Sequence, residues 1–146
     1  MEERSNLDKR YTLELSEKQA EIIKIALEEY FRLRLNQWFD FVTNIALCGY
    51  EYDKSDPDND RKFDDYINRR NESQELFEKA FRTAQPNYQM KTDEMMIAED
   101  IWQVIRHKLY LDRDGDPNGW SVDAREPIKL SDETLPKMEV FDDDKP

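Results

Sequence analysis

The chain has 146 residues, a net charge of −12 and 7 Phe, 7 Tyr and 3 Trp. This length fits one domain of ordinary size, and the aromatic content argues against a disordered chain. The acidic charge disfavours nucleic acid as a partner, because nonspecific binding to nucleic acid depends on Lys and Arg that neutralise phosphates.

The cellular setting is indicated by features that the sequence lacks. Cys48 is the only cysteine, so the chain forms no internal disulfide and fits a reducing cytoplasm. The start of the chain lacks the apolar stretch of a signal peptide, and no window approaches about 18 apolar residues. We therefore expect a cytoplasmic protein that does not enter a membrane.

The first predicted elements are a strand and a long helix. Apolar and polar residues alternate over Arg10–Ser16, which is typical of a half-buried strand. Ser16 then predicts a helix N-cap, with Gln19 at the capping-box position. The helical pattern continues over Glu17–Leu47, about 45 Å at roughly 1.5 Å per residue. Such a helix is too long for a compact domain of this size.

Two alternatives reconcile this length with a small domain. The helix either bends near Arg34–Gln37 or extends into an oligomeric interface, and we favour the interface.

Two further helices follow a polar loop over Glu51–Asp60. The apolar spacing predicts the second helix over Arg61–Thr83. Thr92 or Asp93 caps a third helix that runs to about Leu111. This order of segments predicts three helices in all.

The alternating residues of Trp120–Ala124 predict a second strand, which pairs with the N-terminal one. We therefore expect an α+β fold, mostly helical, with about three helices and a small antiparallel sheet formed by an N-terminal and a C-terminal strand. A single domain spans residues 1–126, and residues 127–146 form an acidic, extended C-terminal tail.

No pattern in the sequence indicates catalysis or a resident cofactor. His107 is the only histidine, and the spacing motifs of nucleophilic enzymes, nucleotide-binding loops and zinc sites are missing. Asp112–Asp123 resembles a calcium-binding loop, but Pro117 stands where that loop needs glycine. Asp56–Asp60 fails at the same position, which is Arg61. We expect a protein without enzymatic activity, metal or cofactor.

The cationic cluster Arg106-His107-Lys108 stands out in this acidic chain. It lies near the end of the third helix, where cations interact favourably with the helix dipole. Alternatively, Arg106 binds a phosphate or carboxylate through its two-pronged guanidinium, joined by Arg69-Arg70 and Arg82. Four aromatic residues have two alternative roles: their rings either stack a base beside these cations or fill the core. They are Phe77, Phe81, Tyr88 and Trp102.

Three stretches together resemble a known family: Tyr11–Ala20, Ala98–His107 and Glu126–Glu139, the last including Glu126-Pro-Ile-Lys-Leu-Ser. In this order they resemble small proteins of bacteriophages that infect Gram-positive hosts, and specifically the anti-Thoeris sponge family. The resemblance covers about a third of the chain. It implies a protein of the host-cell cytoplasm that sequesters cyclic ADP-ribose isomers or cyclic oligonucleotides without cleaving them, in pockets shared between the subunits of a homo-oligomer. Candidate residues for the family's aromatic ring, asparagine and arginines are Phe77, Asn87, Arg106, Arg82 and Arg70.

An alternative function rests on the charge alone. An acidic surface can occupy a basic groove on another protein, so the chain could instead act as an anti-CRISPR-like inhibitor of a host defence protein. The acidic segment Asp132–Pro146 would then contribute to binding, and this binding would weaken at high salt.

Overall fold

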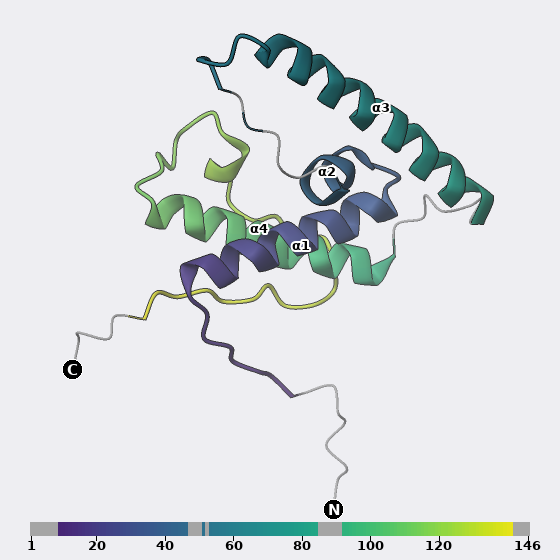
Figure 1. Cartoon of the computed structure of the whole chain (residues 1–146). Coiled ribbons are helices and arrows are strands. Elements are labelled where there is room, and N and C mark those ends of the chain that lie inside the picture. The colour runs from purple at the N-terminus through teal and green to yellow at the C-terminus, as the bar shows by residue number, and fades with distance from the viewer. Residues whose placement is uncertain (1–8, 47–50, 52, 85–91, 142–146) are drawn as a thin grey trace, which may run out of the picture.

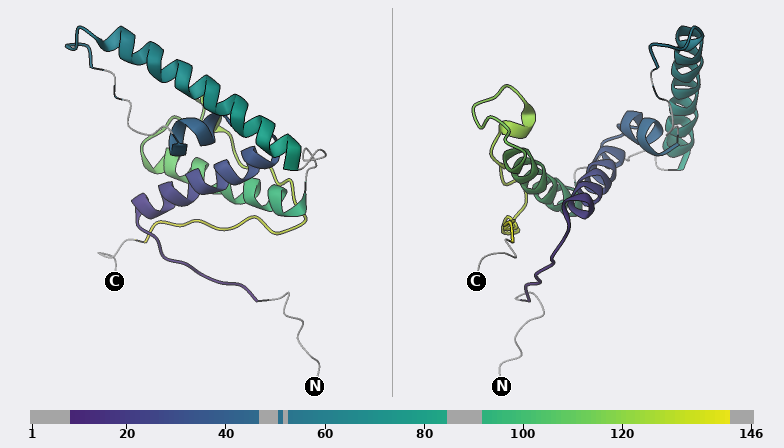
Figure 2. Two further views of the ribbon diagram at one scale, coloured as in Figure 1. Left: turned by 45° about the vertical axis from the view of Figure 1, so that its right-hand side comes forward. Right: turned by 60° about the vertical axis from the view of Figure 1, so that its left-hand side comes forward.

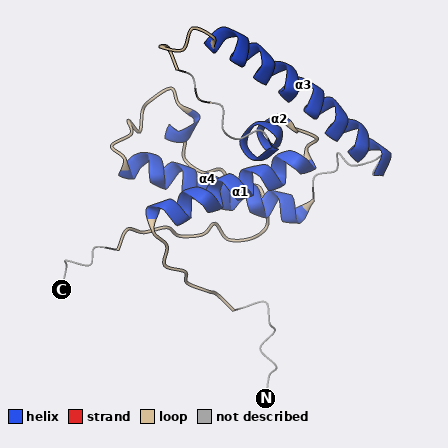
Figure 3. Cartoon of the chain, in the orientation of Figure 1, coloured by secondary structure: helices blue, strands red, loops and turns tan. Residues whose placement is uncertain are grey.

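The structure is a computed structural model that describes residues 9–46, 51, 53–84 and 92–141. In chain order, its elements are α1 (Glu17–Arg34), α2 (Phe39–Phe41), the π-helix η2 (Val42–Ala46), α3 (Asn59–Ala84), α4 (Asp93–Asp112) and the 3-10 helix η3 (Val122–Ala124). Figure 3 shows only helices and loops in this part of the chain. The prediction of an α+β fold with a small antiparallel sheet is therefore wrong, and the described residues form a helical protein.

The two predicted strands do not pair. The N-terminal one is extended from Tyr11 to Leu15 but lies in no ladder. The predicted C-terminal strand at Trp120–Ala124 instead enters η3, because the Ser121 hydroxyl accepts the Asp123 N–H at 3.1 Å and favours a turn. Alternation of apolar residues predicted two strands, and neither is present in the described residues, because alternation contains no information about a pairing partner.

Helix α1 begins where the sequence predicts and ends earlier. The Ser16 side chain accepts the Gln19 N–H, and the Gln19 side chain accepts the Ser16 N–H, which confirms the capping box. The favoured continuation as one helix to Leu47 is wrong, because the helix stops at Arg34 and the chain resumes as α2 at Phe39. The other alternative, a bend near Arg34–Gln37, is where the structure breaks the helix. Asn36 adopts a left-handed backbone with φ of 61°, and the Gln37 N–H reaches back to the Arg32 carbonyl at 2.8 Å. This Schellman turn ends the helix within the protomer.

The core lies between α1 and α4, which cross in the middle of Figure 1. The helices run in opposite directions, so the end of α4 at Arg113 meets the start of α1 at Glu17. Thr92 caps α4 by accepting the Met95 N–H, which confirms the predicted start of this helix. The buried centre and the apolar residues around it are Ala20, Ile105, Leu109, Ile23, Leu27, Ile101 and Met138.

A second layer of packing attaches α3 to the rest of the molecule. Helix α3 confirms the predicted second helix and stands outside α2 and η2, away from α4, as both views of Figure 2 show. Trp38, only 2% exposed, is edge-on to the Phe81 ring at 4.3 Å and stacks on Phe77 at 6.4 Å. Phe41 meets Phe77 edge-on at 5.4 Å. Asn59 is the only residue of α3 that is buried. This aromatic cluster therefore joins α3 to the segment around α2.

Residues 125–141, which we call the C-terminal strap, run beneath α1 and α4 in Figure 1. Two side chains of α4 hold it by hydrogen bonds to its backbone. Gln103 donates to the Ile128 carbonyl at 2.9 Å and accepts the Ile128 N–H at 3.0 Å. Asp100 accepts the Leu130 N–H, the Ser131 N–H and the Ser131 hydroxyl at 2.8, 3.0 and 2.6 Å. The strap is fixed to α4 along residues 128–131.

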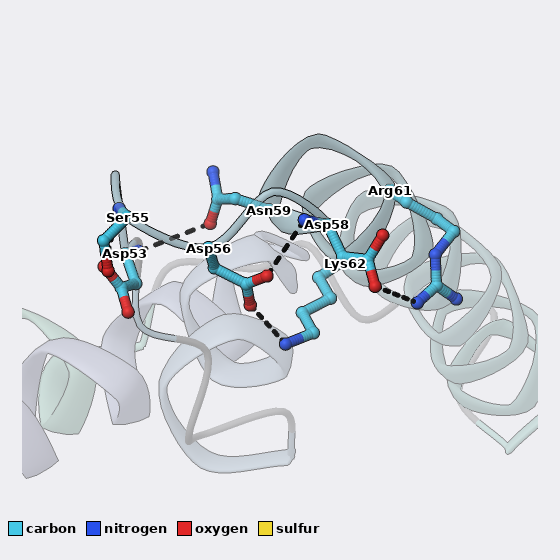
Figure 4. A network of polar contacts seen from close by, with 7 residues as sticks. All are labelled: Asp53, Ser55, Asp56, Asp58, Asn59, Arg61 and Lys62. Atoms are coloured by element: carbon cyan, nitrogen blue, oxygen red, sulfur yellow. Dashed lines mark hydrogen bonds and ion pairs between the residues drawn. The ribbon is translucent and has the colours of Figure 1, made fainter.

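The acidic segment before α3 uses its carboxylates locally (Figure 4). Asp53 accepts the N–H and the hydroxyl of Ser55, and Asp56 accepts the Asp58 N–H and pairs with Lys62. These bonds hold the pKa of Asp53 and of Asp56 below the ordinary range. The carboxylates stabilise the loop before α3 and the first turn of α3, and they do not surround a common binding point.

Candidate anion site

A depression of about 150 Å³ lies where the end of α4 meets α1 and the turn that leads to η3. Three cations line it, and one carboxylate faces them. In full, the lining residues are Lys24, Arg106, Leu109, Tyr110, Arg113, Gly115 and Asp123. Cations are concentrated here although the chain as a whole carries a charge of −12.

Arg106 is the most deeply buried of these cations, with 7% of its surface exposed. Its guanidinium carbon lies 4.4 Å from the centre of the Trp102 ring, a cation–π contact. Its Nε is 3.6 Å from Asp123 Oδ1, which is too far for a hydrogen bond, and this buried Nε has no hydrogen-bond partner. Burial lowers the pKa of Arg106, while the charges of Asp123 and Glu28 oppose that shift. An arginine remains protonated under these conditions, so the depression contains an incompletely satisfied cation.

The other two cations are partly neutralised at the rim. Lys24 Nζ lies 2.6 Å from Glu21 Oε1. Arg113 pairs with Glu17 at 2.6 Å and with Glu21 at 3.1 Å. These pairs raise the pKa of Arg113 and lower that of Glu21, and they fix the end of α4 against α1. An incoming anion can share Lys24 and Arg113 with the glutamates, because both cations have further donors.

The turn after α4 shapes the outer wall of the depression. Asp114 has a φ of 59°, and the Gly115 N–H donates to the Tyr110 carbonyl at 2.9 Å, a second Schellman turn. The Tyr110 hydroxyl donates to the Asp116 carbonyl at 2.9 Å. His107 Nδ1 lies 2.9 Å from the Asp123 carbonyl and ties η3 to α4. The wall is thus built by contacts along one helix and the loop after it.

Replacing Gly115 with alanine is expected to destabilise the protein by about 1–3 kcal/mol. A Cβ at this position would lie 2.5 Å from the Tyr110 carbonyl oxygen and 2.6 Å from carbons of the Tyr110 ring, so the turn must shift. Urea unfolding of Gly115→Ala beside Gly119→Ala measures the effect. The second substitution brings its Cβ within 2.9 Å of the Tyr110 hydroxyl oxygen and 3.0 Å of the Asp116 carbonyl oxygen, and because both distances are longer than those at Gly115, a smaller loss is expected there. Equal stability of Gly115→Ala and the unmodified chain would contradict this packing.

The structure does not bring the predicted binding residues into one place. Arg106 lies in the depression, whereas Arg70, Phe77 and Arg82 belong to α3. The guanidinium of Arg70 lies 4.7 Å from the Phe39 ring centre, and Phe77 packs in the aromatic cluster with Trp38 and Phe41. Asn87 lies outside the described residues.

Arg82 has a surface of its own. It is exposed and pairs with Glu78 on the preceding turn of α3. With Glu75, Lys79 and Thr83 these residues line a shallow hollow of about 500 Å³. Two carboxylates stand beside the two cations there, so the hollow has no excess of positive charge.

Several lining residues of the depression were not predicted from the sequence. Lys24 reads as one of many charges on an amphipathic helix, and Arg113 and Asp123 read as parts of a polar turn. Lys24 reaches the depression through the antiparallel crossing of α1 and α4, which residue spacing does not specify, whereas Arg113 lies two turns after Arg106 at the end of the same helix. Asp123 is brought in by the turn that leads to η3. Two features of the sequence indicate Arg106: its place in the cationic cluster and its match to an arginine of the family that the chain resembles.

Within the described residues, no cluster of three His, Cys, Asp or Glu side chains is placed to bind a metal ion. No helix in the same part of the chain combines the length and apolarity needed to cross a bilayer. No protein-family model, no curated protein sequence and no solved structure matches the chain.

Proposed function

We propose that this chain is a non-enzymatic binding protein that takes a phosphate group of a nucleotide-type small molecule at the Arg106 depression. The proposed ligand class is the cyclic ADP-ribose isomers or cyclic oligonucleotides that the family resemblance implies, held without cleavage. The single observation that supports this proposal best is the burial of Arg106 with an unpartnered Nε beside two further cations.

The size of the depression fits this role. A volume of about 150 Å³ accommodates one phosphate group but not a whole nucleotide, so the base and sugar must lie outside it. Trp120, which is fully exposed, follows Gly119, and Gly119 lies against the Tyr110 hydroxyl at the rim. An exposed indole one residue after the rim offers a surface on which a base can stack, which contributes roughly 1–3 kcal/mol per base.

Binding by the purified chain should depend on Arg106 and Trp120. Calorimetric titration with cyclic ADP-ribose isomers and cyclic di- and trinucleotides identifies a ligand. For that ligand we expect at least tenfold weaker binding by Arg106→Gln, because a charge-assisted hydrogen bond contributes about 1.5–3 kcal/mol. Trp120→Ala should weaken binding roughly tenfold without affecting folding, since the side chain packs against nothing. Arg82→Ala is the matched control and should bind as the unmodified chain does.

The outcomes separate the possible sites. Unchanged binding by both Arg106→Gln and Trp120→Ala would show that the ligand sits elsewhere, and loss in Arg82→Ala would favour the hollow on α3. No binding of any of these nucleotides would contradict the proposal. The inhibitor of a host defence protein would then be the next candidate, tested by salt-dependent capture of a partner.

A further inference from the structure

Asp123 is the residue that brings a negative charge into the lining of the Arg106 depression. The other charged side chains of the lining belong to Lys24, Arg106 and Arg113, and the remaining lining residues are uncharged. A site for phosphate alone gains nothing from a carboxylate, because two anions repel each other. Asp123 therefore restricts which phosphate groups the depression can take.

The backbone of Asp123 is fixed, while its carboxylate is open to a ligand. The Asp123 N–H donates to the Ser121 hydroxyl at 3.1 Å, and its carbonyl oxygen lies 2.9 Å from His107 Nδ1. These contacts hold η3 beside α4 (Figure 1). None of the described residues donates a hydrogen bond to the carboxylate, and Arg106 Nε lies 3.6 Å from it. Because 42% of the Asp123 side chain is exposed, its oxygens can accept a hydrogen bond from a bound molecule.

The charges around the depression are balanced before a ligand arrives. Lys24 and Arg113 are each paired with a glutamate at the rim, and Asp123 stands beside Arg106. A phosphodiester brings one negative charge, whereas a phosphate monoester brings up to about two at neutral pH. The second charge has no further cation in the lining to neutralise it, and it is repelled by Asp123. The depression therefore favours a phosphate group that is esterified twice.

We infer that Asp123 makes this site selective for a phosphodiester with a free ribose hydroxyl beside it. The cations hold the phosphate, and the Asp123 carboxylate accepts a hydrogen bond from the hydroxyl. This hydroxyl is the ligand's donor closest to the phosphate, since it stands on the sugar carbon next to the one that bears the ester. A base amino group lies farther away, outside a depression of about 150 Å³. This inference rests on the proposed function and adds which phosphate and which sugar the site accepts.

Three small nucleotides test the two parts of this selectivity in the full chain. They are cyclic AMP, its deoxyribose analogue and AMP, titrated at about pH 8, where the phosphate of AMP carries two charges. Chemical shifts of the Arg106 side chain and the Gly115 amide measure binding at the depression. We expect cyclic AMP to bind about tenfold more tightly than its deoxyribose analogue, which lacks the hydrogen bond to a charged acceptor. Cyclic AMP should also bind several-fold more tightly than AMP, because AMP brings the second charge.

Two substitutions at Asp123 separate its charge from its hydrogen bond. Asp123→Asn keeps an acceptor oxygen and removes the charge, so AMP should bind several-fold more tightly while a preference for ribose persists. Asp123→Ala removes both, so cyclic AMP and its deoxyribose analogue should bind within about twofold of each other. Asp112→Asn is the matched control: Asp112 lies at the end of α4, pairs with Lys108 and does not line the depression. It should leave both affinity ratios unchanged.

The ratios between nucleotides decide the outcome, because a purely structural role of Asp123 would weaken all three nucleotides alike. Equal binding of cyclic AMP and its deoxyribose analogue by the unmodified chain would overturn the inference, as would AMP that binds as tightly as cyclic AMP. An unchanged ribose preference in Asp123→Ala, or no shift at the depression with cyclic AMP, would overturn it as well. The proposed function fails separately, when Arg106→Gln and Trp120→Ala both bind the nucleotide found by calorimetry as the unmodified chain does.

Discussion

Replacing Asp100 with alanine is expected to lower the free energy of unfolding by about 3 kcal/mol and the melting temperature by roughly 6–12 °C. The carboxylate is 3% exposed and accepts three hydrogen bonds from the strap, two from N–H groups and one from the Ser131 hydroxyl. Without it, these donors lose a charged acceptor within a largely buried contact. Urea unfolding measures the loss, and hydrogen exchange at residues 128–131 should rise with it.

Asp132→Ala is the matched control for this experiment, because Asp132 lies on the same strap with an exposed side chain. It should change stability by less than about 0.5 kcal/mol. A similar loss in both variants would show that the strap responds to any loss of negative charge. No loss in Asp100→Ala would contradict the role of the three hydrogen bonds.

The same carboxylate should make stability depend on pH in the acid range. Burial raises the pKa of Asp100, but the hydrogen bonds from Ser131 and Leu130 outweigh it, and the pKa is lowered from its ordinary 3.8. A group with a lowered pKa in the folded state contributes its stability above the unfolded value, and loses it as the pH falls through the folded value. The stability difference between the unmodified chain and Asp100→Asn should therefore be constant above about pH 5 and shrink below pH 4.

Replacing Trp38 with alanine is expected to cost about 3–5 kcal/mol, and its effect should be concentrated in α3. Trp38 is 2% exposed and contacts both Phe77 and Phe81, which are the aromatic anchors of α3. Asn59 is the only buried residue of that helix, so the aromatic contacts of Trp38 contribute a large share of its packing. Hydrogen exchange should show α3 amides losing most of their protection while α1 and α4 amides keep theirs.

Trp120→Ala provides the control, because it removes an indole that packs against nothing. This variant should exchange like the unmodified chain throughout α3. Uniform loss of protection in α1, α3 and α4 after Trp38→Ala would mean that the chain unfolds as a single cooperative unit. That result would contradict the expectation that α3 can lose its packing while α1 and α4 stay folded.

The starts of α1 and α4 and the course of α3 were predictable from the sequence because their determinants are local, whereas α2, η2 and η3 were not predicted. Ser16 and Thr92 specify the starts of α1 and α4 through bonds to residues three positions away. Apolar residues at helical spacing define the faces that pack. The end of α1 was also encoded locally, since Asn is one of the few residues that tolerates the left-handed conformation seen at Asn36. The apolar pattern beyond it concealed that signal, so the predicted helix ran too far.

Contacts between distant residues were not predictable. Alternation over Arg10–Ser16 predicted extended backbone, but the pairing with Trp120–Ala124 depended on a partner that the fold does not supply within the described residues. The clamp of Asp100 and Gln103 on the strap joins residues 25 to 31 positions apart. In the sequence these two side chains look like ordinary polar positions of an amphipathic helix.

The candidate site likewise combines features that the sequence specifies locally with contacts that depend on tertiary structure. The sequence by itself determined the acidic charge, the helices and the cationic cluster that contains Arg106, because each depends on composition or on neighbours within one or two turns. Arg106 lies one helical turn after Trp102 and two turns before Arg113, so their nearness follows from helical spacing. Only the tertiary structure buried Arg106, brought Lys24 beside it, and separated it from Arg70, Phe77 and Arg82. The physical reason is that helix crossing depends on how whole side-chain surfaces fit together, and this fit is a property of pairs of elements rather than of either sequence segment.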